Sequence, residues 1–127
     1  MKQHLLIVED EVLILLSLAM ILRSESTEVT TASNGKSGLL EISNFPDFDL
    51  YIIDLTLPDM SGLELIKTIK KQQPHANIIV MTGRYLNKQI MLKKMKGAEE
   101  IKDCHFLTKP FDINQVKETV SQILQNT

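Results

Sequence analysis

The sequence contains a single cysteine, Cys104, among its 127 residues. One thiol can form neither an internal disulfide nor a cysteine-rich metal site, so we expect a reducing, cytoplasmic setting. A long apolar run is also missing, because the longest, residues 12–22, is interrupted by Ser17 and is shorter than the ~20 residues of a membrane span. The acids just before this run argue against a signal peptide, whose leading charges are basic. We therefore expect no membrane partner.

Neither sign of charge dominates, since the net charge is only −2. The chain as a whole is therefore not drawn to nucleic acid or to membranes. Basic residues gather only between Arg84 and Lys96, where five occur without an acid. A solvated helix face explains them better than an anionic partner, because no aromatic interleaving or DNA-reading helix accompanies them. We predict no direct contact with nucleic acid.

Strand-like and helix-like patterns alternate along the chain, whose length fits one domain. Strands are predicted at residues 5–8, 29–32, 50–53, 77–81 and 105–108, and the first of these is a continuous apolar run typical of a strand buried on both faces. Helices are predicted at residues 12–24, 36–43, 62–71, 87–96 and 113–124, with Ser61 and Asp112 as caps. Five strand-helix units with right-handed crossovers predict a three-layer α/β fold with a doubly wound, five-stranded parallel sheet.

The commonest strand order for such a sheet is the flavodoxin-like order 2-1-3-4-5. This order makes the first and third strands neighbours, so Asp10 and Asp54 lie side by side near their ends. Residues just past the carboxyl ends of parallel strands meet at one edge, where open α/β sheets bind ligands. No glycine-rich phosphate loop follows the first strand, and its acids would repel a pyrophosphate, so a nucleotide-binding enzyme is a weak alternative.

Carboxylates crowd this predicted edge: Glu9, Asp10 and Glu11 follow the first strand and Asp54 follows the third. Two such charges ~4 Å apart repel by about 4 kcal/mol at an effective dielectric constant near 20. A divalent cation relieves that repulsion, and oxygen-only ligands favour Mg²⁺ over zinc. Alternatively some of these acids, above all Glu11, cap the helix that begins near Val12.

A hydroxyl and an ammonium are predicted at the same edge, from Thr82 and Lys109 at the ends of two other strands. The long stem of Lys109 lets its ammonium reach Asp54. A carboxylate, a cation, an ammonium and a hydroxyl together form a socket for a phosphoryl group. Taken alone, however, a strand-end threonine is more often a helix cap.

Four segments, IVEDE, IIDLTLPDMSGLEL, VMTG and FLTKPF, together resemble the receiver domain of two-component response regulators. The resemblance covers essentially the whole chain and implies one receiver domain over residues 1–127. It implies phosphoryl transfer from a histidine kinase or histidine phosphotransfer protein, followed by a conformational switch that signals to a partner. Such a domain promotes its own phosphoryl transfer and hydrolysis and is not an enzyme acting on another substrate. The downstream partner and a homodimer stay open.

The resemblance also implies a role for each acid. Asp54 is the phosphoacceptor. Mg²⁺ is bound by Asp54, by Asp10 directly, by Glu9 through water and by the main-chain carbonyl of Thr56. A rival hydrolase of the haloacid-dehalogenase type needs an aspartate two residues after its nucleophile, where Thr56 stands. An inert binding domain is a second rival, which the complete set of Asp10, Asp54, Thr82 and Lys109 argues against.

A switch is implied as well. Lys109 pairs with Asp54 and then with the phosphoryl group, and the Lys109–Pro110 peptide is expected to be cis. Phosphorylation adds charge and acceptor oxygens to Asp54, which draw Thr82 inward. Phe106 then fills the vacated space, although an ordinary core aromatic is an equal alternative for this residue.

Some features depart from the family pattern. About five extra residues follow Gly97, around Glu99 to Asp103, beside the surface that receiver domains commonly use for output. Gly83 stands where alanine is usual in the family. Thr56 and Arg84 occupy the two positions that the family uses to tune phosphoryl lifetime, and we expect Arg84 to alter dephosphorylation. The helix predicted from residue 12 is apolar nearly all round, which predicts either a docking face for a kinase or phosphotransfer helix or a well-covered core helix.

Overall fold

A computed structural model of the protein describes residues 2–83 and 97–125. The strands are β1 (Gln3–Val8), β2 (Thr27–Ala32), β3 (Leu50–Asp54), β4 (Ile78–Thr82) and β5 (His105–Thr108). The helices are α1 (Val12–Leu22), α2 (Gly35–Asn44), α3 (Gly62–Gln72) and α5 (Ile113–Gln125), with a 3₁₀ helix, η1 (Ala98–Ile101). The predicted helix at 87–96, the basic cluster and Arg84 lie outside the described residues.

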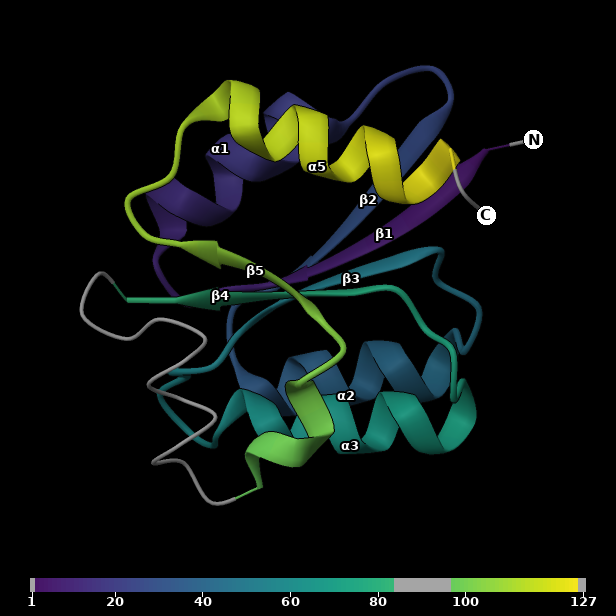
Figure 1. The fold of residues 1–127 in the computed structure, drawn as a ribbon, viewed down its shortest axis with the longest axis vertical. Helices are drawn as coiled ribbons and strands as arrows, with labels where there is room; N and C mark the ends of the chain where they lie inside the picture. Colours follow the sequence, from purple (N-terminus) through teal and green to yellow (C-terminus); the bar gives the residue numbers. More distant parts are fainter. Residues whose placement is uncertain (1, 84–96, 126–127) are drawn as a thin grey trace.

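The five strands form one parallel sheet in the order β2-β1-β3-β4-β5, which confirms the predicted fold. Helices α1 and α5 cover one face of the sheet, and α2 and α3 cover the other (Figure 1). All strands run toward the same edge, which lies at the left of Figure 1. The loops that follow β1, β3 and β5 therefore meet there.

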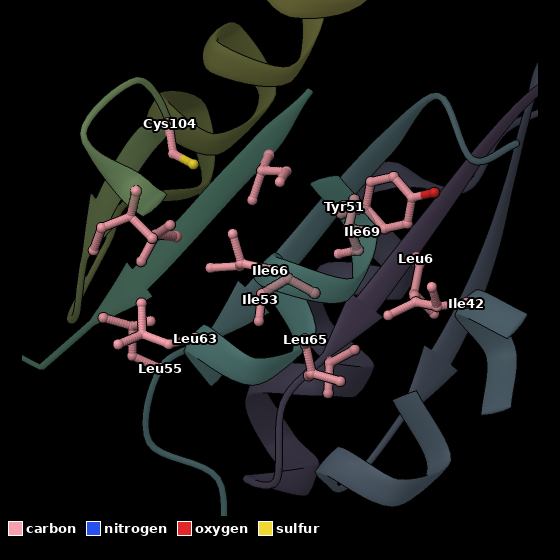
Figure 2. Close-up of a cluster of buried hydrophobic side chains, with 14 of the residues drawn as sticks. Leu6, Ile42, Tyr51, Ile53, Leu55, Leu63, Leu65, Ile66, Ile69 and Cys104 are labelled. Atoms are coloured by element: carbon pink, nitrogen blue, oxygen red, sulfur yellow. The ribbon is translucent and has the colours of Figure 1, made fainter. Parts of the chain in front are cut away.

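The central strands are buried at every position, because helices cover both of their faces. Successive side chains point to opposite faces. Ile53 and Val80 belong to the hydrophobic cluster under α2 and α3, part of which Figure 2 shows. Ile52 and Ile79 belong to the second cluster, under α1 and α5. The two hydrophobic clusters, one on each face, thus fix the strands whose carboxyl ends form the edge described above.

Some predicted boundaries were wrong at the sheet's outer side. β2 begins at Thr27 instead of residue 29, since an edge strand with a solvated face does not need an apolar sequence. Helix α1 ends at Leu22 instead of residue 24. Arg23 is already extended, and Ser24 forms a bridge with Thr27 that turns the chain directly into β2.

The extra residues after Gly97 are anchored to α3. They form η1, whose Ile101 is fully buried in the cluster under α2 and α3. The ammonium of Lys70 donates to the carbonyl of Glu100 and to the carboxylate of Asp103. The insertion is thus fixed to the fold by both apolar and charged contacts. Its effect on an output surface stays a prediction.

Candidate functional site

The site is built on the ends of three strands. Asp54 is the last residue of β3, Glu9 follows the adjacent β1, and Lys109 follows β5. The Lys109 ammonium lies 2.6 Å from Glu9 Oε1 and 3.0 Å from Asp54 Oδ2. The predicted contact between Lys109 and Asp54 is therefore confirmed, although 55 residues separate them.

Burial sets the electrostatics of this group. Glu9 is 0% exposed and Asp54 4% exposed. Burial, hydrogen bonding and charge from Asp54 raise the pKa of Glu9 to about 7, and Lys109 only partly opposes them. Burial also acts to lower the pKa of Lys109, but its contacts with Glu9 and Asp54 outweigh that effect and raise it. At neutral pH Glu9 is therefore partly protonated, and Lys109 stays a charged ammonium between Glu9 and Asp54.

The acidic cluster has the chemistry of a magnesium site. One carboxylate oxygen from each of Glu9, Asp10 and Asp54 lies within 4.8 Å of the others. All three donors are hard oxygens, and the exposure of Asp10 leaves room for the water that Mg²⁺ retains. The side chains present therefore fit a hard divalent cation. The main-chain carbonyl of Thr56 stays a predicted ligand.

The carboxylate of Asp54 has a second fixed contact. The amide of Thr56 donates to Asp54 Oδ1 at 2.9 Å, while Lys109 approaches the other carboxylate oxygen. Each oxygen of Asp54 is thus held by a different donor. The orientation of the carboxylate is set by the loop after β3 together with Lys109, the residue after β5.

Glu11 has a contact that the sequence did not predict. It occupies the N-cap position of α1, but its side chain makes no capping hydrogen bond. Its Oε1 instead lies 3.6 Å from the Lys109 ammonium. The carboxylate of Glu9 accepts the Glu11 amide at 3.2 Å. The prediction that the Glu11 side chain caps α1 is therefore wrong. The only signal in the sequence for its contact with Lys109 was the clustering of acids after the first strand.

Thr82 presents a buried hydroxyl at the end of β4. Its side chain is almost fully buried, and its Oγ1 has no hydrogen-bond partner among the residues described. A buried hydroxyl without a partner is unfavourable, so this atom is suited to accept a new contact. The amide of Lys109 donates to the Thr82 carbonyl at 2.7 Å. The alternative, that Thr82 caps the following helix, concerns residues outside those that the structure describes.

Two further features, one in β5 and one directly after it, were predicted. The Lys109–Pro110 peptide is cis. Phe106 is half-buried and packs against the cluster under α2 and α3. This packing fits both a core aromatic and a switch residue, so its switch role stays a prediction.

Helix α1 carries an apolar surface beside the site. Its inner side buries residues such as Leu15 and Leu18, whereas Leu13, Leu16 and Met20 are 79%, 54% and 77% exposed. The interpretation of α1 as a covered core helix is therefore wrong for its outer side. We call Val12, Leu13, Leu16 and Met20 the α1 patch. None of the helices in the described ranges is both long and apolar enough to cross a membrane.

Comparison with known proteins agrees with this geometry. The family model described as the response regulator receiver domain matches residues 5–121. The chain belongs to this family. Accepting a phosphoryl group is the function of receiver domains, and they bind Mg²⁺ at an acidic pocket such as the one that Glu9, Asp10 and Asp54 form here.

Individual relatives resemble the receiver domain over nearly its full length. The cell cycle response regulator CtrA of Brucella ovis is 28% identical over 124 residues, which are 98% of this chain and 51% of CtrA. The chain thus spans about half the length of the curated relatives it matches.

Solved structures also match. A CheY-like receiver domain protein of Methanospirillum hungatei has a TM-score of 0.83 at 29% identity, with coverage of 99% of this chain and 96% of that one. The receiver domain of NtrX from Brucella abortus has a TM-score of 0.79 at 27% identity, with coverage of 97% and 99%. The similarity therefore extends over complete receiver domains.

Proposed function

We propose that Asp54 of this receiver domain accepts a phosphoryl group from the phosphohistidine of a histidine kinase or histidine phosphotransfer protein. One carboxylate oxygen of Asp54 attacks phosphorus. A phosphorus–oxygen bond forms as the phosphorus–nitrogen bond breaks, and the electron pair leaves on the imidazole nitrogen. The product is an aspartyl phosphate. The observation that carries this proposal is the Lys109 ammonium 3.0 Å from Asp54 within a cluster of carboxylates.

The neighbouring residues have distinct roles. Lys109 offsets charge on the transferring group, and the Thr56 amide orients the nucleophile. Glu9, Asp10 and Asp54 would hold Mg²⁺, with the carbonyl of Thr56 as a further ligand. When bound, Mg²⁺ supplies positive charge that offsets the negative charge of the phosphoryl oxygens. The positive charge of Mg²⁺ and of the Lys109 ammonium would also offset the repulsion among the carboxylates.

Phosphorylation then changes the conformation of the domain. The phosphoryl group brings additional negative charge and acceptor oxygens. The Thr82 hydroxyl, which is buried and has no partner among the described residues, moves to donate to one of these oxygens. Phe106 moves into the space that Thr82 leaves. The two conformations differ in their contacts, so phosphorylation shifts their populations and signals to a downstream protein. The domain also promotes its own dephosphorylation.

The α1 patch binds the helix that carries the phosphohistidine. Helix α1 begins two residues after Asp10, so the patch borders the acidic cluster. A contiguous exposed apolar surface is typical of a protein-binding site. Histidine kinases are the partners that the family implies. A cytoplasmic location agrees with this partner and with the single, buried cysteine Cys104.

The phosphoacceptor is tested with acetyl phosphate and Mg²⁺, followed by intact mass measurement. The parent should gain one phosphoryl group, and Asp54→Asn should gain none. Omission of Mg²⁺ should also abolish the gain. The matched control is Asp47→Asn, which changes an exposed acid before the same strand and should behave as the parent. A full gain in Asp54→Asn contradicts the proposal.

The docking site is tested with two phosphodonors. Leu16→Gln and Met20→Gln should slow transfer from a phosphohistidine protein and leave the rate with acetyl phosphate unchanged. Leu40→Gln is the control, because Leu40 is a comparably exposed leucine on α2, across the sheet. Equal effects of Leu16→Gln and Leu40→Gln on protein-to-protein transfer rule out a role of the α1 patch.

A further inference from the structure

Asp59 connects two loops that are far apart in the sequence. It lies in the β3–α3 loop, and its Oδ1 and Oδ2 accept the amides of Gly35 and Lys36 at 2.7 and 2.9 Å. These amides belong to the first turn of α2, where backbone donors have no partner within the helix. The two hydrogen bonds lower the pKa of Asp59, so the acceptor is a carboxylate at neutral pH. We call these two bonds the Asp59 clamp.

The clamp depends on a close approach of the β3–α3 loop to α2. A Cβ atom on Gly35 would lie 2.3 Å from Met60 Cγ and 3.0 Å from Asp59 Oδ1. A side chain at residue 35 would therefore have to displace the side chains of Met60 and Asp59. Helix α2 already has its own cap, because Asn34 Oδ1 accepts the amide of Ser37 at 2.8 Å. Asp59 therefore adds a connection between loops and is not the helix's sole cap.

The same loop holds the nucleophile at its other end. The Thr56 amide donates to Asp54 Oδ1, and Thr56 forms a bridge with Ser61. The Gly62 amide donates to the Leu55 carbonyl at 2.9 Å, which closes the base of the loop. Asp59 fixes the opposite end. The peptide units on either side of Thr56 thus lie in a loop that is held at both ends.

The strand order places the Asp59 clamp next to the acidic cluster. β1 lies between β2 and β3, and Glu9 follows it. The Glu9 amide donates to the carbonyl of Ala32, the last residue of β2. The clamp joins the turn after β2 to the loop after β3, on the side where α2 and α3 pack together (Figure 1). The loops flanking Glu9 are therefore tied to each other.

We propose that Asp59 is a positioning residue of the phosphoryl site. Its carboxylate fixes the β3–α3 loop against α2, so that the amide of Thr56 orients Asp54 and the carbonyl of Thr56 stays available to Mg²⁺. This inference rests on the proposed function, because it assigns Asp59 a role in the same site. It goes further in naming a residue that contacts neither phosphoryl group nor metal.

The test compares Asp59→Ala with Asn34→Ala. Both variants remove acceptors at the start of α2, but only Asp59→Ala releases the β3–α3 loop. Asp59→Ala should weaken Mg²⁺ binding, measured by calorimetry, and slow phosphorylation by acetyl phosphate, each by roughly ten-fold, as is typical for residues that orient metal ligands. Asn34→Ala should stay close to the parent in both measurements. Asp59→Asn keeps one acceptor oxygen and should be intermediate.

A second variant separates positioning from helix stability. Gly35→Ala introduces a better helix former, so α2 itself loses nothing in propensity. Its methyl group would displace Met60 and Asp59, and the variant should reproduce the loss seen in Asp59→Ala. Urea unfolding of each variant verifies that the domain is folded under the assay conditions.

The outcomes distinguish this inference from the proposed function. Equal losses in Asn34→Ala and Asp59→Ala would assign the effect to helix stability and overturn the clamp. Parent-like Mg²⁺ affinity and rate in Asp59→Ala and Gly35→Ala would also overturn it. A parent that binds Mg²⁺ but takes no phosphoryl group contradicts the proposed function, while weaker Mg²⁺ binding in Asp59→Ala still supports the clamp. A parent that does neither contradicts both.

Discussion

Helices α1 and α3 have the same length and cover opposite faces of one sheet, yet their outer surfaces differ. Helix α3 turns a narrow apolar stripe, including Ile66, to the core. Ser61 caps its start, Glu64 lies in its first turn, and Lys70 lies in its last turn. Both charges have the sign that stabilises a helix end. The cap, the end charges and the buried stripe of α3 therefore all favour a stable helix with one side in solvent.

Helix α1 lacks these features and exposes apolar side chains. It has no side-chain cap, no acid in its first turn and no base in its last turn. Leu13, Leu16 and Met20 face solvent and contribute little to folding. The contrast teaches that the apolar residues of α3 are used for packing, whereas α1 packs with one side and exposes further apolar residues on the other. The helix next to the acidic cluster is the one with the exposed apolar surface.

The largest effect on stability is expected at the buried side of α3. Ile66 is fully buried in the cluster of Figure 2, so Ile66→Ala removes side-chain contacts and leaves a cavity. The free energy of unfolding should fall by roughly 2–5 kcal/mol. Urea denaturation followed by circular dichroism measures it. A fall well below this range would mean that α3 is less important to the core than its burial indicates.

A smaller effect is expected at the start of α3. Ser61 accepts the amide of Leu63 at 3.2 Å, and Ser61→Ala removes this acceptor. The free energy of unfolding should fall by about 1 kcal/mol. Thermal unfolding provides the measurement, with Ser43→Ala as the control, because Ser43 is an exposed serine near the end of α2. An equal decrease in Ser43→Ala would mean that the loss in Ser61→Ala does not come from the missing cap.

The charged contact between α3 and η1 should depend on pH. The ion pair with Lys70 holds the pKa of Asp103 below its ordinary value of 3.8. A carboxyl whose folded pKa is lowered stabilises the protein above its unfolded pKa, and this contribution is lost as pH falls through the folded pKa.

Asp103→Asn should therefore lower stability at neutral pH, by less than about 1 kcal/mol because the carboxylate is largely exposed. The difference from the parent should shrink as the pH falls below 3.8. Urea midpoints measured across this range give the result. A difference that grows in acid would contradict the assigned direction of the pKa.

The smallest effect is expected on the outside of α1. Leu16→Gln and Met20→Gln keep helix propensity, since glutamine is close to leucine and methionine on that scale. The free energy of unfolding should change by less than about 0.5 kcal/mol. Leu18→Gln is the matched contrast on the same helix, because Leu18 is fully buried and should lose several times more. Similar losses at Leu16 and Leu18 would show that the α1 patch is part of the fold.

The parts that were predictable from sequence are those with a simple physical pattern. β3 and β4 are buried on both faces, so they are continuous apolar runs in the sequence. Parallel strands end at one edge, so the contact between Asp54 and Lys109 followed from strand order despite their separation. The caps at Ser61 and Asp112 were confirmed because capping depends on residues only two or three positions apart.

Other parts depend on packing that leaves no pattern in the sequence. The bonds from Gly35 and Lys36 to Asp59 join residues 24 and 23 positions apart, with no periodicity to mark them. The 3₁₀ helix η1 owes its position to one apolar residue, Ile101, and to a distant lysine. The apolar sequence of α1 did not show which side would face solvent, since all sides look alike until the sheet is in place.

The hydrogen bond from the Lys109 amide to the Thr82 carbonyl continues the β4–β5 ladder past its last residue pair, Thr82 and Thr108. This additional bond holds the ends of the two strands together, so we expect a lateral displacement of one strand end to break it or to move the other strand end as well. Deuterium uptake at the Lys109 amide would therefore report whether the two strand ends separate or whether a rearrangement at this edge involves side chains alone.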